Sequence, residues 1–173
     1  MKVKFKKLHE GARLPEKATE GSAAYDLYVA EDIIINPGRQ IIPLGFAMEM
    51  EQGYEALIDP RSGFSSKGME GIWIADIGVA DENGIQEFNA PVCSTRFDCD
   101  VIEGKIDSDY RMGVGVIVHN RETGSYLIKA GTRIAQMTFH KVETVQWEET
   151  EELSETNREG GFGSTGTKSR LWL

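Results

Sequence analysis

Short apolar segments, rich in β-branched and aromatic residues, recur along the first 140 residues of the chain. Turn residues separate them, as at Pro37-Gly38, Gln52-Gly53 and Thr123-Gly124. Segments of this length and spacing are typical of an all-β sandwich or barrel. One short helix is expected, at 61–67. The strands are expected at 3–5, 24–29, 33–35, 40–42, 46–50, 54–58, 114–118, 126–128 and 133–140.

The stretch Gly104-Lys-Ile-Asp-Ser-Asp-Tyr110 places two carboxylates and a phenol close together. In a strand, alternation would put Asp107 and Asp109 on one face and Tyr110 on the other. A β-branched run follows at 114–118, so we expect a rigid hairpin, which suits a general base beside a ring. Taken alone, an acidic pair at a strand end is more often simply solvated.

Two further stretches are suited to binding anions. Ser62 is expected to cap a short helix that begins near Gly63, with Arg61 and Lys67 on either side. Free N–H groups at a helix start attract phosphate, although an ordinary cap with surface charges has the same sequence. Near the C-terminus, 158–166 combines glycines, hydroxyls and one phenylalanine. This composition suits phosphates and a base, but it is also usual for flexible linkers.

Composition narrows the class of protein. A chain of 173 residues with 40% hydrophobic residues suits one domain with a proper core. The net charge of −9 argues against binding to a nucleic-acid backbone. No apolar run reaches the length of a membrane span and the basic N-terminus lacks the apolar region of a secretory signal, so we expect a soluble, cytoplasmic protein. The two cysteines, Cys93 and Cys99, are expected to be reduced thiols.

Five short motifs are spread over nearly the whole chain: Ala23-Ala-Tyr-Asp-Leu27, Pro60-Arg-Ser-Gly63, Gly104-Lys-Ile-Asp-Ser-Asp-Tyr110, Gly131-Thr-Arg-Ile-Ala-Gln136 and Gly160-Gly-Phe-Gly-Ser-Thr-Gly166. Taken in this order, they resemble the motifs of the trimeric dUTP diphosphatase (dUTPase) family. The second, third and fifth motifs are highly specific in combination, whereas the first and fourth are weak alone.

The resemblance implies a distorted jelly-roll β-barrel and hydrolysis of dUTP to dUMP and pyrophosphate with Mg2+. Asp107 stands where the family has the aspartate that activates water to attack the α-phosphorus. Asp109 is then a structural residue. Asp26, from the first motif, would help to organise the Mg2+ site through water rather than bind the ion directly.

The resemblance also implies which residues bind the substrate. Tyr110 would pack beneath the deoxyribose and exclude a 2′-hydroxyl, while the backbone from Gly104 through Ile106 would recognise uracil. The phosphates would be held by Arg61, Ser62, Gly63 and Gln136. The C-terminal arm would close the site through Arg158, Phe162, Gly163, Ser164 and Thr165. Each site would be shared among the three chains of a homotrimer.

The expected domains are a β-barrel at 1–143 and a flexible C-terminal arm at 144–173. The connection between the second and third motifs is longer than is usual in the family, and we interpret roughly 77–100 as an insertion. Its apolar residues predict a folded segment that packs against its own barrel, a neighbouring subunit or a separate protein partner. Packing within the trimer is the simplest of these choices.

Two other functions remain open at this point. A deaminase of the same fold that acts on dCTP would need a glutamate base in the third motif, where this chain has Asp107. An interaction protein built on a dUTPase scaffold would use the insertion to bind a regulatory partner, with or without catalysis.

Overall fold

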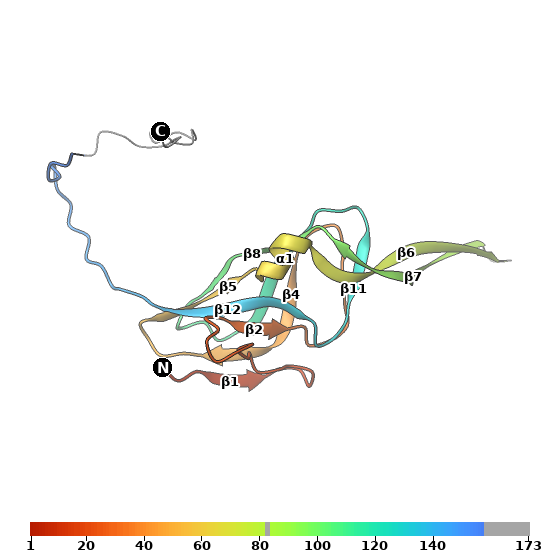
Figure 1. Cartoon of the computed structure of the whole chain (residues 1–173), viewed down its shortest axis with the longest axis horizontal. Coiled ribbons are helices and arrows are strands. Elements are labelled where there is room, and N and C mark those ends of the chain that lie inside the picture. Colours follow the sequence, from red (N-terminus) through yellow and green to blue (C-terminus); the bar gives the residue numbers. More distant parts are fainter. Residues whose placement is uncertain (82–83, 158–173) are drawn as a thin grey trace, which may run out of the picture. The chain divides into compact units, whose positions relative to one another are not determined.

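The computed structural model of the chain describes residues 1–81 and 84–157 (Figure 1). Strands dominate these residues, which confirms the all-β prediction. The elements are β1 (Lys4–Lys7), β2 (Tyr25–Tyr28), β3 (Ile33–Ile35), β4 (Gly38–Glu49), β5 (Tyr54–Asp59), α1 (Ser62–Lys67), β6 (Met69–Asp81), β7 (Gly84–Phe97), β8 (Cys99–Ile102), β9 (Gly104–Ile106), β10 (Gly113–Asn120), β11 (Ser125–Ile128) and β12 (Arg133–Lys141).

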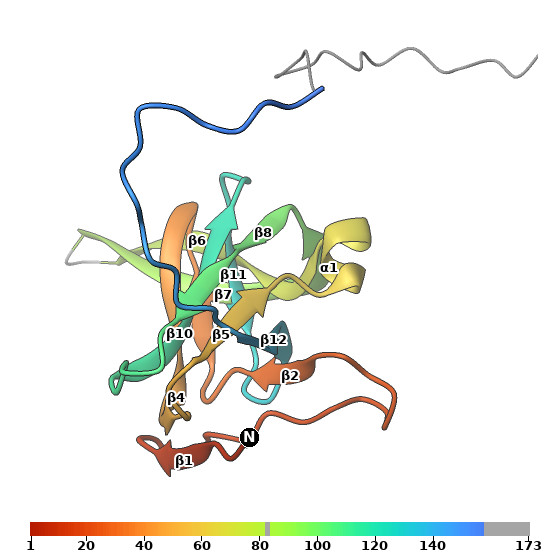
Figure 2. The same cartoon turned by 90° about the vertical axis from the view of Figure 1, so that its left-hand side faces the viewer.

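The strands form three antiparallel sheets of four strands each, with the orders β1-β4-β10-β8, β3-β11-β6-β7 and β2-β12-β5-β9. Figure 2 shows the strands wrapped around a common interior. One cluster of buried apolar side chains fills it and draws on all three sheets, as with Val116 of β10, Ile128 of β11 and Leu27 of β2. Most sheet neighbours are distant in sequence, so long-range pairing rather than local turns determines which strands meet.

Alternation in β10 follows directly from its sequence. Val114, Val116 and Val118 are 2%, 0% and 0% exposed, whereas the residues between them are less buried. A strand with one face on the core requires this period of two. The strand expected at 114–118 is confirmed, and the structure shows which of its faces is buried.

Strand β4 joins two strands that were expected to be separate, at 40–42 and 46–50. Pro43 lies opposite Gly115, where the register of β10 shifts, so the missing proline N–H falls at a point where the ladder is already irregular. Gly45 has a φ of 72°, and an added Cβ would lie 2.9 Å from the Cβ of Ala30. Glycine therefore lets the strand turn closely past its neighbour and continue.

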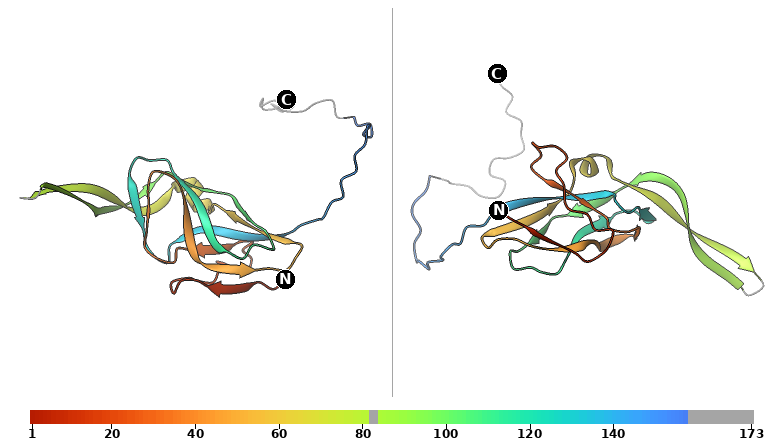
Figure 3. Two further views of the ribbon diagram at one scale, coloured as in Figure 1. Left: turned by 180° about the vertical axis from the view of Figure 1, so that it is seen from behind. Right: turned by 90° about the horizontal axis from the view of Figure 1, so that it is seen from below.

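Strands β6 and β7 form a long hairpin, paired from Met69–Phe97 at its foot to Asp81–Gly84 at its far end. Strand β11 pairs with β6 only between Ile72 and Ile74. Beyond that point β6 and β7 pair with each other, and Figures 1 and 3 show them running outward from the barrel as a two-stranded ribbon. The far part of the hairpin therefore does not lie on its own barrel.

The foot of the hairpin belongs to the core. Phe97 is 2% exposed and stacks on Tyr126 with ring centroids 3.9 Å apart. Cys99 is 4% exposed, and burial raises the pKa of its thiol to about 12. The segment outside the barrel is therefore shorter at its C-terminal end than the range 77–100. Cys93 is exposed on β7, and both cysteines are free thiols.

Phe97→Ala should lower the free energy of unfolding by about 3–5 kcal/mol, because it leaves a large cavity at the foot of the hairpin and removes the stacking on Tyr126. Chemical denaturation at matched protein concentration measures the loss. Val92→Ala on the same strand, where the side chain is 53% exposed, is the control and should cost far less. Equal losses in both variants would contradict the assignment of Phe97 to the core.

The chain divides into two units, Met1–Glu143 and Thr144–Leu173. Residues 144–157, the described part of the second unit, are exposed and contain no helix or strand. Among the described residues, no helix is long and apolar enough to cross a membrane.

Candidate active site

Asp107 lies one residue beyond the end of β9, at the start of a turn. The turn is closed by the Tyr110 N–H, which donates to the Asp107 carbonyl oxygen at 3.1 Å. Strand β9 pairs with β5, whereas β10 pairs with β4 and β8 in another sheet. The prediction of a hairpin around Asp107 is therefore wrong, because the loop connects two sheets instead of two paired strands. The buried residues Ile106 and Val114 anchor the loop at its two ends.

A pocket of about 220 Å³ lies beside this loop. The structure brings together in its wall three of the residues that were expected to bind the substrate, Gly104, Ile106 and Tyr110. The Tyr110 hydroxyl donates to the carbonyl oxygen of Gly113 at 3.1 Å, which fixes the ring across the loop. Asp107 is exposed at this end of β9, so its carboxylate is accessible to a ligand or to water.

A second cluster is centred on Asp26 of β2, which is 8% exposed. Arg61 Nε donates to Asp26 Oδ1 at 2.8 Å, and Arg133 Nη1 donates to Asp26 Oδ2 at 3.3 Å. Gln136 of β12 lies beside Asp26 in register and faces Asp59 of β5 on its other side. Two guanidinium groups thus neutralise the buried carboxylate of Asp26. The carboxylate in turn holds the Arg61 side chain in place.

Arg133 has no predicted role from the sequence. The sequence offers one hint that Arg133 belongs to the site, which is its place in the fourth motif, Gly131-Thr-Arg-Ile-Ala-Gln136. It stands there two residues after a turn glycine with a φ of 81°. The contact to Asp26 depends on the pairing of β12 with β2, which the sequence does not specify.

The short helix α1 differs from its prediction at the N-terminus. Ser62 is the first helical residue, and Arg61 occupies the N-cap position with extended backbone and no side-chain capping bond. The Phe64 N–H donates to the Arg61 carbonyl oxygen at 2.9 Å. Ser62 is therefore not the cap. Ser62 and Gly63 are exposed at the helix start, next to the Asp26 cluster.

The Asp107 loop and the Asp26 cluster lie near opposite ends of β5. Ala56 of β5 pairs with Ile106, so Asp107 adjoins the beginning of the strand. Arg61 lies two residues beyond its last residue, Asp59. Ala56 and Asp59 are three positions apart in the strand, a rise of about 10 Å. Asp107 and Arg61 of one chain are therefore separated along β5, whereas Gly104 pairs with Ile58, next to Asp59.

A protein-family model for dUTPase matches residues 10–86 and 97–166. The chain belongs to the dUTPase family. The residues left between the two matched segments lie in β7, the outer strand of the hairpin.

Curated relatives agree with this assignment. The deoxyuridine 5'-triphosphate nucleotidohydrolase of Nautilia profundicola is 40% identical over 168 residues, covering 96% of this chain and 99% of that protein. The protein of the same name from Anaplasma marginale is 40% identical over 173 residues, with coverage of 96% and 99%.

Solved dUTPase structures share the fold, so the jelly-roll barrel is confirmed. The dUTPase of Staphylococcus bacteriophage 80alpha with dUPNHPP has a TM-score of 0.73 and 26% identity, covering 95% of this chain and 98% of that one. A dUTPase from phage phi11 of S. aureus that coordinates a structural Mg(II) ion has a TM-score of 0.66 at 22% identity, with coverage of 88% and 98%. At that identity the likeness concerns the fold alone.

In the part of this dUTPase-family chain that the structure describes, the donor groups do not form a metal cage of their own. No three His, Cys, Asp or Glu side chains are grouped to hold a metal ion within the described residues. Both Asp26 oxygens already accept from guanidinium groups. Asp26 could therefore reach a metal ion only through water, which suits an ion such as Mg2+ that commonly keeps several waters and binds substrate phosphates.

The predicted residues of the fifth dUTPase motif, Arg158, Phe162, Gly163, Ser164 and Thr165, lie outside the described residues.

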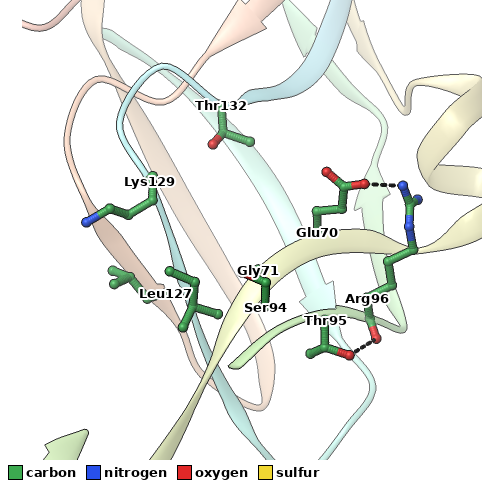
Figure 4. A pocket seen from close by; sticks show the side chains of 9 residues that line it. Glu70, Gly71, Ser94, Thr95, Arg96, Leu127, Lys129 and Thr132 are labelled. Carbon is green, nitrogen blue, oxygen red and sulfur yellow. Dashed lines mark hydrogen bonds and ion pairs between the residues drawn. The ribbon is translucent and has the colours of Figure 1, made fainter. Parts of the chain in front are cut away.

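Another hollow, of about 440 Å³, lies at the foot of the hairpin (Figure 4). Its walls include Gly71 of β6, Thr95 of β7 and Lys129 after β11. An ion pair between Glu70 and Arg96 spans one side of it. None of the predicted site residues that the structure describes lines this hollow.

Proposed function

We propose that this member of the dUTPase family hydrolyses dUTP to dUMP and pyrophosphate, with Asp107 as the base that activates water for attack on the α-phosphorus. One observation carries the proposal. Asp107 is exposed at the end of β9, beside a pocket formed by Gly104, Ile106 and Tyr110, in a segment that the dUTPase family model matches. The curated relatives named deoxyuridine 5'-triphosphate nucleotidohydrolase support the choice of substrate.

In the proposed complex, the pocket beside the loop binds the nucleoside. Backbone groups from Gly104 through Ile106 recognise uracil, and the Tyr110 ring packs on the deoxyribose where a 2′-hydroxyl would clash. The hydrogen bond from the Tyr110 hydroxyl to Gly113 supports this role, because it holds the ring in one orientation. A fixed ring excludes a ribonucleotide by shape without reorganising.

The phosphates are held by the second cluster. The Arg61 guanidinium is oriented by Asp26, and Ser62, Gly63 and Gln136 lie near it. Asp26 would also contact the waters around Mg2+, which supplies charge neutralisation to the triphosphate when it is bound. We propose that residues 144–173 form an arm attached to a barrel at 1–143. The arm would close over the base and the phosphates through Arg158, Phe162, Gly163, Ser164 and Thr165.

We further propose a homotrimer with shared sites. Each site takes the Asp107 loop from one chain, the Arg61 cluster from a second and the arm from a third. The positions of Asp107 and Arg61 toward different ends of β5 support this arrangement, because the base and the phosphates of one dUTP must lie close together. A closed ring with three identical heterologous interfaces satisfies the requirement.

The direct test is product analysis with Mg2+ and dUTP, dCTP or UTP, with EDTA added in a matched control. We expect dUTP to give dUMP and pyrophosphate, and dCTP and UTP to remain intact. In 18O-labelled water the label should enter dUMP, because water attacks the α-phosphorus. Release of dUDP, label in pyrophosphate, or conversion of dCTP to dUTP would contradict the proposal.

A further inference from the structure

A second carboxylate, Glu55, belongs to β5, the strand that pairs with β9 just before Asp107. Ala56 of β5 pairs with Ile106 of β9, and both side chains are buried, at 0% and 7% exposed. Because side chains alternate along a strand, Lys105 belongs to the opposite face, and Asp107 follows on that face if the alternation continues beyond the end of β9. The last register pair is Ala56–Ile106; if the pairing is continued by one position beyond the end of β9, Asp107 comes across from Glu55. Residues directly opposite in antiparallel strands have Cβ atoms about 5 Å apart.

Glu55 is too enclosed for water to screen its charge fully. Its side chain is 17% exposed, compared with 55% for Lys105. Two carboxylates that face each other in this setting repel, which displaces the more mobile one. Lys105 prevents this, because its ammonium forms a hydrogen-bonded ion pair with Glu55.

The pKa of Lys105 also reflects the negative charge of Asp107, the proposed base. The hydrogen bond to Glu55 raises the pKa of the Lys105 ammonium above its ordinary value, and the charges of Glu103 and Asp107 act in the same direction. Arg111, on the loop after Asp107, is directed elsewhere: it donates to the carbonyl oxygens of Ser108 and Tyr110 and lies 3.9 Å from a Glu49 oxygen. The titratable and charged groups around Asp107 are Glu55 from β5, His140 opposite Glu55 on β12, Glu103 and Lys105 along β9, and Asp109 and Arg111 in the loop.

We propose that the Lys105–Glu55 ion pair positions Asp107 for water activation by neutralising the carboxylate that faces it. The side chains of Lys105 and Glu55 are positioning groups, since they act through Asp107 and not on the substrate. The inference rests on the role of Asp107 in the proposed function and extends it to two residues of the strands beneath.

The test is the pH dependence of kcat/KM for dUTP in the full chain. Lys105→Met leaves Glu55 unpaired opposite Asp107, so the acid limb of the profile should move to higher pH by about one unit or somewhat less. Glu55→Gln removes the facing charge and should move the limb to lower pH. The double variant removes both charges and should return the limb close to that of the unmodified chain, and Lys105→Arg should leave it in place. A purely structural pair would not give this order.

A second readout separates failure of this inference from failure of the proposed function. The titration of the Asp107 carboxyl, followed by 13C NMR and assigned with Asp107→Asn, should move in the same order even without turnover. If Asp107→Asn remains active while the NMR titrations shift as expected, the base assignment fails and the electrostatic coupling stands. If the NMR titration midpoint is the same in Lys105→Met, Glu55→Gln and the unmodified chain, the inference is overturned. Glu55→Gln alone still decides the outcome if Lys105→Met does not fold.

Discussion

Asp107→Asn should lower the turnover of dUTP by at least ~100-fold, the usual scale for losing a positioned base, while binding of the nucleotide is retained. The amide has nearly the shape of the carboxylate, but it cannot accept a proton from water. The loop should survive, since it is held by the backbone bond from Tyr110 to Asp107 and by buried Ile106. Steady-state kcat measures the loss, and titration with a non-hydrolysable dUTP analogue measures binding.

Asp109→Asn is the matched control for this prediction. Asp109 is also exposed and lies two residues further along the same loop, so its replacement makes the same change in charge. We expect a much milder effect on turnover. Near-normal activity of Asp107→Asn, or equal losses in both variants, would remove Asp107 from the role of base.

Local sequence patterns predict those strands whose residues alternate clearly about the core. The valines of β10 and the apolar runs of β5 and β11 are examples, because one buried face imposes the period of two. The expected strands omit β6 through β9. The outer part of the hairpin is stabilised by pairing between β6 and β7, and β9 has only three residues. Its pairing with β5, not β10, is a long-range choice that no local motif encodes.

The residues of the candidate site likewise fall into those that local patterns predict and those whose contacts depend on long-range pairing. The motif residues Gly104, Ile106 and Tyr110 could be grouped from the sequence because they lie within one loop and its strand. The two arginine contacts to Asp26 join residues 35 and 107 positions apart, so they depend on the finished barrel. Ser62 fits a capping pattern, yet the chain enters the helix one residue earlier. Turn chemistry alone does not fix that boundary.

The second large effect concerns the sharing of sites between chains. Arg61→Gln should also abolish most turnover, because it removes a phosphate-binding guanidinium and one of the two groups that neutralise Asp26. Lys67→Gln is the control, since Lys67 is exposed on the same helix and has no proposed contact with substrate. We expect it to keep far more activity than Arg61→Gln.

The most direct test of the account mixes the two inactive proteins, Asp107→Asn and Arg61→Gln, under conditions that exchange subunits. If each site takes its base from one chain and its Arg61 from a neighbour, random equal mixing leaves about one quarter of the sites intact. We therefore expect dUTP turnover to recover to about that fraction of the activity of the unmodified protein. Exchange is verified by mass spectrometry of differently tagged chains. No recovery despite complete exchange would show that Asp107 and Arg61 do not meet across a subunit boundary and would contradict the shared site.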